Sequence, residues 1–339
     1  MKSSNKLYAF GCDFSPDTGE GFLANAILSH VQRTNDVVVY GDPVVRLLRR
    51  RPLSRDRLLP LYLFVVILGY LARNRRVLLL NYAAIWNFLN AALVRFGASL
   101  GPITGSVFIV PRSARLRDRV LRLYIQRILV GAFLRLYPRG RLVWAATPSV
   151  MAQFERAQMP RLTFGFPFAV HVVARNCADK KFDIFIYSGH HPIKNHSAAL
   201  AAVSTLASAN YKVCYVGPDF VGNGLSVTAF FNLPEALFNQ YLGESRLYIS
   251  FSFEDAGITG MKALAFGVPI LCPARSGLAY MTAYDAEFCY DDPDALDDIC
   301  DKAGHILSRP QDYSTRAALY FSRARSATAQ SIEIWSNDL

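Results

Sequence analysis

The chain has 339 residues, of which 52% are apolar and 19% are charged, and its net charge is +11. This composition excludes a disordered chain, and the length is sufficient for two hydrophobic cores. The first residues lack the apolar region and cleavage site of a secretory signal, so we expect a cytoplasmic protein. No two of the six cysteines form a CxxC pair, which favours buried thiols over a disulfide framework or a zinc site.

The positive charge is concentrated in the first half of the chain. Residues 1–150 hold 22 Lys and Arg against 7 Asp and Glu, a net charge of +15, whereas residues 151–339 have a net charge of −4. Such asymmetry indicates that one half faces an anionic surface, either nucleic acid or anionic lipid. No nucleic-acid-binding motif is present, which favours lipid.

Strands and helices alternate in this first half. Strands are predicted at residues 6–14, 36–41, 75–82, 106–111 and 141–147, and helices at 22–33 and 84–97. The loop between the first strand and the first helix contains Gly19 and Gly21, which allow a backbone to approach a ligand closely. We expect these glycines, with Asp17 and Glu20 beside them, to contact a bound ligand.

Arginines frame two apolar stretches of this half. The apolar run from Leu58 to Ala72 has arginines on both sides, but it is shorter than the about 20 residues of a spanning helix. In the second stretch, residues 112–141, Arg115, Arg119 and Arg122 alternate with aliphatic residues. Both patterns are typical of helices in a lipid headgroup layer, although a solvated helix packed on a core remains open.

The second half repeats the alternation after a change in composition. Residues 161–181, with Pro, Gly and polar residues, are predicted to be a linker. Strands are then predicted at 182–189, 211–218, 246–251 and 268–274, and helices at 198–209, 234–245 and 312–339. We therefore predict an α/β protein with parallel sheets and a ligand site between its two halves. The expected domains are residues 1–165 and 182–315, with a C-terminal helix at 316–339 that crosses back to the first.

Two loops of the second half carry the residue types that hold a diphosphate. His190, His191 and Lys194 directly follow a predicted strand, where a lysine can pair with phosphate. In the other loop Gly257 frees the backbone, and the amides of Ile258 and Thr259 open a helix whose positive end attracts anions. Glu254, just before it, could accept hydrogen bonds from sugar hydroxyls. A solvated loop at 188–196 and a helix-capping role for Glu254 are the alternatives.

The segment EDAGITGMKALAFGVPI resembles the donor site of retaining glycosyltransferases of the GT-B fold, particularly family 4, whose pattern is roughly E-G-F-G-L-x-x-x-E-A-M-A-x-G-x-P-V. The matching residues are Glu254, Gly257, Ala263, Gly267 and Pro269. FIYSGHHPIKNH resembles the family's strand followed by G-R-x-x-x-x-K-N, and DTGEGFLANAI resembles its N-terminal glycine loop. GPITGS is similar to another loop of its acceptor domain. The resemblance thus covers both halves.

This resemblance implies two Rossmann-like domains facing a cleft. It implies transfer, with retention of configuration and without a metal or cofactor, from a nucleotide sugar to a lipid-linked or saccharide acceptor. Such enzymes serve bacterial polysaccharide synthesis, and we expect this one to be peripheral on the inner membrane. The resemblance assigns Lys194, with His190 or His191, to the diphosphate and Glu254 to the transferred sugar. We further expect Gly19 and Gly21 to help bind the sugar donor, and Asp17 and Glu20 to bind the acceptor.

The sequence departs from the family pattern at two places. Lys262 stands where the family has its second Glu, which holds the nucleotide ribose, and His190 stands about where an Arg is expected. Lys262 either contacts an anionic part of the donor or marks a different nucleotide pose. Two other functions therefore stay open: an inactive sugar-nucleotide-binding partner of another transferase, and a nucleotide-sugar epimerase with the same double fold.

Overall fold

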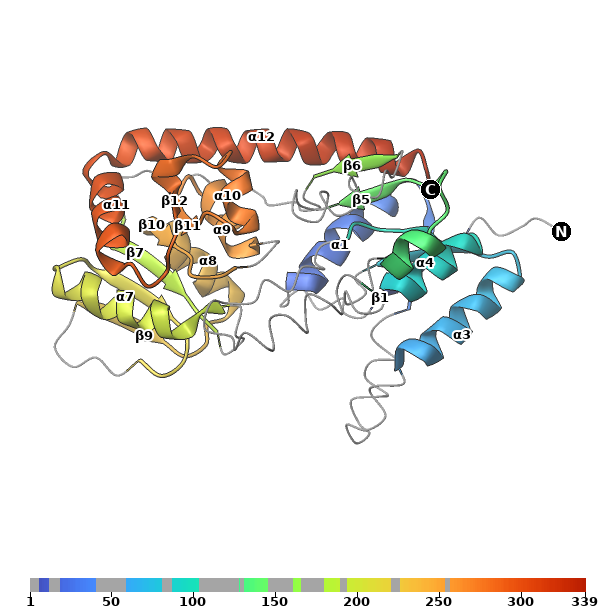
Figure 1. Ribbon diagram of the computed structural model, residues 1–339, viewed down its shortest axis with the longest axis horizontal. Coiled ribbons are helices and arrows are strands. Elements are labelled where there is room, and N and C mark those ends of the chain that lie inside the picture. The colour runs from blue at the N-terminus through green and yellow to red at the C-terminus, as the bar shows by residue number, and fades with distance from the viewer. Residues whose placement is uncertain are drawn as a thin grey trace. The chain divides into compact units, whose positions relative to one another are not determined.

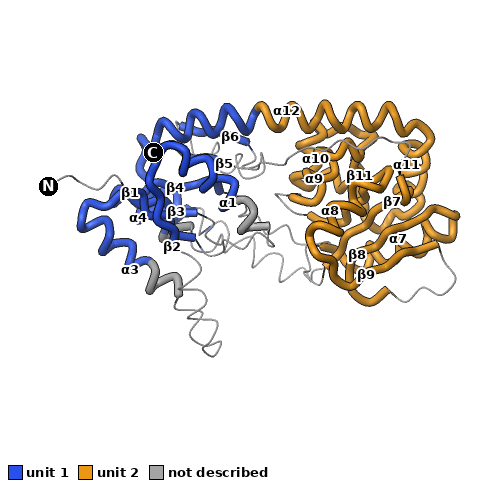
Figure 2. The backbone as a smooth tube through the Cα atoms, turned by 180° about the vertical axis from the view of Figure 1, so that it is seen from behind, with its two compact units in different colours: residues 1–108, 115–169, 327–339 blue, residues 109–114, 170–326 orange. Residues whose placement is uncertain are grey.

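The computed structural model divides the chain into two compact units (Figure 2). Unit 1 comprises residues 1–108, 115–169 and 327–339, and unit 2 comprises residues 109–114 and 170–326. The structure describes residues 6–11, 19–40, 59–80, 87–103, 128, 131–145, 161–165, 180–189, 194–220, 226–253 and 257–339; of residues 19–23, 59–63, 87–89 and 164 it describes the backbone.

Unit 1 contains a parallel sheet with the strand order β2-β1-β3-β4. Its strands are β1 (Lys6–Gly11), β2 (Asp36–Tyr40), β3 (Arg76–Leu80) and β4 (Ser99–Leu100). Along the chain, β1 is followed by β2, which pairs with one side of β1, and then by β3, which pairs with the other side. A parallel pair, β5 (Val143–Ala145) and β6 (Leu162–Phe164), is linked to the chain beyond β4 by a bridge between Ile103 and Ala145.

The strand β6 corrects one expectation from the sequence, which predicted a linker at 161–181. Its three residues pair in register with β5, and Thr163 is buried. The strand is too short to show an alternating pattern, and the Pro and Gly beside it are typical of a loop. Neighbouring structure, rather than local sequence, therefore determines that these residues form a strand.

Helices cover both faces of the unit 1 sheet (Figure 1). They are α1 (Gly19–Val31), α3 (Leu59–Ala72) and α4 (Asn87–Arg95). Successive side chains of β1 point to opposite faces. Leu7 and Ala9 belong to a core with Ile27 of α1, whereas Phe10 belongs to another with Ile67 of α3.

The apolar run from Leu58 to Ala72 is described as the helix α3 from its second residue onward. Ile67 is fully buried in the core, and Val65 is 65% exposed, so the helix is apolar on its outer side as well. Within the described residues, no helix is long and apolar enough to cross a membrane. The second arginine-framed stretch lies mostly outside the described residues.

Unit 2 contains a six-stranded parallel sheet with the order β12-β11-β10-β7-β8-β9. Its strands are β7 (Phe182–Tyr187), β8 (Val213–Val216), β9 (Val227–Phe230), β10 (Ser245–Ile249), β11 (Ile270–Pro273) and β12 (Cys289–Tyr290). The chain starts at the centre with β7, moves out to β9, and returns to β10 on the other side of β7. This is the winding of a doubly wound sheet. The edge strands β9 and β12 were not expected, because β9 is only partly buried and β12 has two residues.

Two pairs of helices pack on this sheet. Contacts place α7 (His196–Ser208) and α11 (Leu296–Ser308) against each other and the sheet, and likewise α8 (Glu235–Gly243) and α9 (Ile258–Ala265). The sheet is therefore enclosed between these two layers, as its continuous buried strands require. The short helix α10 (Gly277–Met281) and a 3₁₀ turn (Ala286–Phe288) lie between β11 and β12 along the chain.

The long helix α12 (Pro310–Ser336) contributes to both units, because residues 310–326 belong to unit 2 and residues 327–339 to unit 1. Its first part is held by charge. Arg316 binds the carboxylates of Asp285 and Glu287, and its guanidinium lies 4.9 Å from the ring centroid of Phe288. Tyr320 donates a 2.5 Å hydrogen bond to Asp285.

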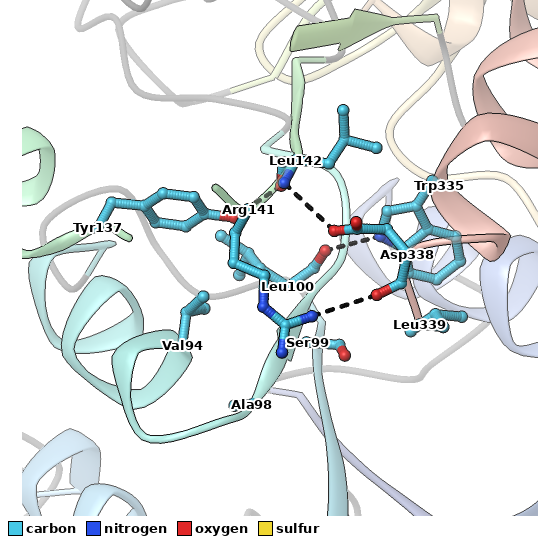
Figure 3. A pocket seen from close by; sticks show the side chains of 10 residues that line it. All are labelled: Val94, Ala98, Ser99, Leu100, Tyr137, Arg141, Leu142, Trp335, Asp338 and Leu339. Carbon is cyan, nitrogen blue, oxygen red and sulfur yellow. Dashed lines mark hydrogen bonds between the residues drawn. The ribbon is translucent and has the colours of Figure 1, made fainter. Parts of the chain in front are cut away.

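The end of the chain is held in unit 1 mainly by a buried indole (Figure 3). Trp335 is 2% exposed, its ring centroid lies 5.5 Å from that of Trp144, and its Nε1 donates a 2.8 Å hydrogen bond to the carbonyl of Leu100. Asp338 accepts hydrogen bonds from the amide of Leu142, at 3.2 Å, and from Arg161, at 2.7 Å. A cavity of about 10 Å³ remains beside these residues.

Candidate functional site

The central strands of unit 2 bring the two predicted binding loops to one place. β7 and β10 are parallel neighbours with Ile249 opposite Ile186, so both strands end at the same edge of the sheet. The connection after β7 leads to α7 in one helix layer, and the connection after β10 leads to α9 in the other. In doubly wound sheets, ligands bind outside the carboxyl ends of the strands at this switch point.

On the β7 side, a partly buried polar cluster holds the start of the first loop. His196, the first residue of α7, has its Nδ1 3.2 Å from the hydroxyl of Ser188 and 3.4 Å from that of Tyr215. Its Nε2 lies 3.6 Å from a carboxylate oxygen of Asp219. Burial, together with the charge of Asp219, raises the pKa of Tyr215 to about 12. Tyr215 therefore stays a hydroxyl and donates to the carbonyl of Pro218 at 3.0 Å.

Lys194 lies in this loop, two residues before α7. Its Nζ is 5.0 Å from the ring centroid of Tyr187, the last residue of β7, an arrangement in which the ring face attracts the ammonium. Asn195, between Lys194 and the helix, has a left-handed backbone with φ 46°. The ammonium is thus at the carboxyl end of the sheet, where the sequence predicts a diphosphate clamp.

On the β10 side, Gly257 shapes the start of α9. It has φ 49°, a left-handed backbone that side chains other than glycine rarely adopt. A Cβ atom at this position would lie 2.4 Å from the Cγ of Leu278, so glycine is also required by packing. The helix begins at Ile258, as predicted. The first amides of a helix have no carbonyl partner within it and can bind an anion.

Several predicted site residues lie outside the described residues: Asp17, His190, His191 and Glu254. Gly19, Glu20 and Gly21 form the first turn of α1, of which the structure describes the backbone. Because β1 has β2 on one side and β3 on the other, α1 follows the strand at the switch point of the unit 1 sheet. The roles expected for all these residues stay predictions.

Lys262 has a partner that sequence reasoning missed. Its Nζ lies 2.7 Å from Oε1 of Glu235, the first residue of α8. A glutamate just after Pro234 is typical of a helix start, and that local role is all the sequence indicates. The pairing joins residues 27 positions apart, so only the packing of α8 beside α9 reveals it.

Comparison with known proteins identifies relatives by structure only. No family model matches the sequence, and no curated protein matches it. Among solved structures, HepE from Anabaena in complex with UDP-glucose aligns with a TM-score of 0.66 and 14% identity over 98% of this chain and 99% of that chain.

Two further solved structures are similar over nearly the whole chain. Sucrose-phosphate synthase from Thermosynechococcus elongatus has a TM-score of 0.69 and 12% identity, and covers 98% of both chains. α,α-Trehalose 6-phosphate synthase from Burkholderia multivorans has a TM-score of 0.64 and 10% identity over 99% of this chain and 95% of that chain. Identities this low show the fold alone. The predicted fold class, α/β of the GT-B glycosyltransferase type, is confirmed.

Proposed function

We propose that this protein is a glycosyltransferase that takes its sugar from a nucleotide-sugar donor, with a uridine nucleotide as the first candidate. One observation carries the proposal: Lys194 and the helix start at Gly257 follow neighbouring strands at the switch point of the unit 2 sheet. The likeness of the whole chain to HepE, whose structure holds UDP-glucose, supports uridine.

The chemistry follows from the charges that develop during transfer. When the bond between sugar and diphosphate breaks, negative charge accumulates on the leaving diphosphate. Lys194, the helix amides at Ile258 and Thr259, and one of His190 and His191 stabilise this charge, and Glu254 binds hydroxyls of the transferred sugar. Preorganised donors of this kind are the largest single contribution in many enzymes. We propose that no metal is needed and that configuration is retained.

We further propose that unit 1 binds the acceptor, a lipid-linked or saccharide molecule of bacterial cell-surface polysaccharide synthesis. The glycine-containing start of α1, with Asp17 and Glu20, is the candidate contact. Its position at the switch point of the unit 1 sheet supports this assignment.

The direct test is turnover in a screen of nucleotide sugars with lipid-linked and saccharide acceptors. We expect acceptor-dependent release of UDP from UDP-glucose or a related donor, unchanged by a chelator, and an anomeric configuration in the product equal to that of the donor. Binding without release would instead identify an inactive partner protein. A sugar altered in configuration while still joined to UDP would identify an epimerase.

A peripheral position on the inner membrane is part of the proposal. Arg73, Arg75 and Arg76, just after the apolar helix α3, are exposed, as is Val65 within it. Each basic side chain near an anionic surface contributes about 1 kcal/mol. Wild-type protein should sediment with vesicles containing phosphatidylglycerol, and salt should release part of it because salt screens this attraction.

Changing these three arginines to glutamate should abolish sedimentation. The matched control reverses three exposed cations of unit 2, namely Lys212, Arg323 and Arg325, and should retain it. Equal losses in both variants would show an effect of net charge alone and would remove unit 1 as the membrane-facing part.

A further inference from the structure

Glu235 and Lys262 form an ion pair between the two helices α8 and α9. Nζ of Lys262 is 2.7 Å from Oε1 of Glu235, and the two side chains are 13% and 37% exposed. The lysine is thus largely enclosed, whereas the carboxylate reaches solvent. Oε2 of Glu235 takes no part in this bond.

The pair lies on the ligand-facing edge of the unit 2 sheet. β9 ends at Phe230, and Glu235 begins α8 five residues later, so Glu235 is at the carboxyl end of a parallel strand. Lys262 is four residues after Ile258 and three after Thr259, spacings that put all three on one side of α9. The Cα atom of Lys262 is therefore about one helical turn, roughly 5.4 Å along the axis, from the start of α9, and its Nζ holds the carboxylate of Glu235.

The charges of the pair determine what it can bind. The lysine ammonium is offset by its carboxylate partner, which leaves little attraction for a further anion such as phosphate. A carboxylate accepts hydrogen bonds only, and Glu235 has an oxygen outside the ion pair. Its natural ligand is a hydrogen-bond donor, such as a pair of neighbouring hydroxyls, and in a nucleotide sugar the ribose carries such a pair close to the diphosphate.

We propose that Glu235 binds the ribose hydroxyls of the donor nucleotide and that Lys262 is the positioning residue that fixes this carboxylate. The inference rests on the proposed function, because it assumes a nucleoside diphosphate at the start of α9. It assigns nucleoside selectivity to α8, which precedes β10 along the chain, and not to α9, whose sequence carries the donor-site pattern.

The experiment compares the calorimetric affinities of UDP and 2′,3′-dideoxy-UDP, which lacks both hydroxyls. Wild-type protein should bind UDP roughly 10- to 100-fold more tightly, since a hydrogen bond to a charged group contributes about 1.5–3 kcal/mol. Glu235→Gln should bring this ratio close to one, because the amide can still accept a hydrogen bond from Lys262 while the negative charge is lost. Lys262→Met should lower the ratio through misplacement of Glu235.

The control variant is Asp183→Asn. Asp183 also forms an ion pair in unit 2, with Arg246 at 3.4 Å, but it lies near the beginning of β7, at the opposite edge of the sheet. This variant should keep the wild-type ratio. A purely structural ion pair between α8 and α9 would change stability and the affinity for both ligands together, and would leave the ratio unchanged.

Four results would overturn the inference. A wild-type ratio near one, or an unchanged ratio in Glu235→Gln, would remove Glu235 from the ribose site while leaving the donor site intact. An equal loss of both affinities in Lys262→Met, with the ratio unchanged, would show that Lys262 does not position Glu235 at the ribose. If wild-type protein binds neither ligand, the donor site itself is wrong and the role of Glu235 falls with it.

Discussion

The two sheets share a winding but differ in what surrounds their carboxyl ends. In unit 1 the first strand is followed by the glycine-rich start of α1, and the sheet is covered by an apolar helix with arginines after it. In unit 2 the same position carries Lys194, the His196 cluster and the Glu235–Lys262 pair. The winding therefore indicates two possible ligand sites, and the polar side chains indicate which of them suits a nucleoside diphosphate.

The largest expected effect is confined to unit 1. Trp335→Ala should lower the free energy of unfolding of this unit by about 3–5 kcal/mol, because it removes a buried indole that packs on Trp144. Urea unfolding monitored by fluorescence measures the loss. Trp335→Phe keeps a ring but not the bond to Leu100 and should cost less. The affinity of the folded variant for UDP should not change; a large change would contradict the assignment of nucleotide binding to unit 2.

The next effect tests the start of α9. Gly257→Ala and Gly260→Ala each place a Cβ atom 2.4 Å from an atom of Leu278, and each should cost about 1–3 kcal/mol of stability through overpacking. Only Gly257 has a left-handed backbone, so Gly257→Ala should cost about 1 kcal/mol more. It should also weaken UDP binding, because it displaces the amides that follow.

Leu278→Ala separates the cost of overpacking from the cost of the left-handed backbone. Measured against Leu278→Ala alone, adding Gly260→Ala should cost little stability, whereas adding Gly257→Ala should still cost the backbone strain. Equal costs of both additions would mean that the left-handed backbone at Gly257 carries no cost of its own.

Lys194 tests by ligand affinity whether unit 2 binds the diphosphate. Lys194→Ala should weaken UDP binding by roughly 10- to 100-fold and uridine binding little, since only UDP carries the charge that an ammonium pairs with. Lys212, exposed before β8 at the far edge of the same sheet, supplies the control Lys212→Ala, which should alter neither affinity. Equal losses for UDP and uridine in Lys194→Ala would place Lys194 outside the phosphate site.

The smallest expected effect is a loss of stability of unit 2 at low pH. Burial would raise the pKa of Asp285, but hydrogen bonds from Tyr320 and Arg316 outweigh it and hold this pKa below its ordinary value; Arg316 likewise lowers the pKa of Glu287. Carboxylates with lowered pKa values stabilise the folded state above their unfolded pKa values of about 4, and this stability is lost as the pH falls further.

Unit 2 should therefore lose about 1 kcal/mol between pH 5 and strongly acidic solution through this cluster, a modest amount because the groups are partly exposed. Arg316→Ala should remove this part of the pH dependence. Urea unfolding as a function of pH tests it, and an unchanged acid slope in the variant would show that other carboxylates are responsible.

The sequence predicted those parts of the molecule that depend on neighbours along the chain. Strand β7 contains the buried apolar run Ile184, Phe185 and Ile186, and a glycine before a helix indicated the start of α9. By contrast, β6 and β9 are short strands whose pairing depends on distant segments, and the Glu235–Lys262 pair depends on two helices packing together. Side-chain pairs of that kind leave no local pattern.

The path of α12 affects how the molecule can be divided. A fragment ending at residue 169 would hold the strands of unit 1 but not Trp335, whose indole completes the core around Trp144. A fragment from residue 170 onward would carry that indole on an exposed tail. If the chain is divided at residue 169, the first fragment therefore lacks part of its core, and the second fragment carries an exposed indole. A chimaera that exchanges the second half also exchanges the last piece of the first half's core, so that piece must match its new host.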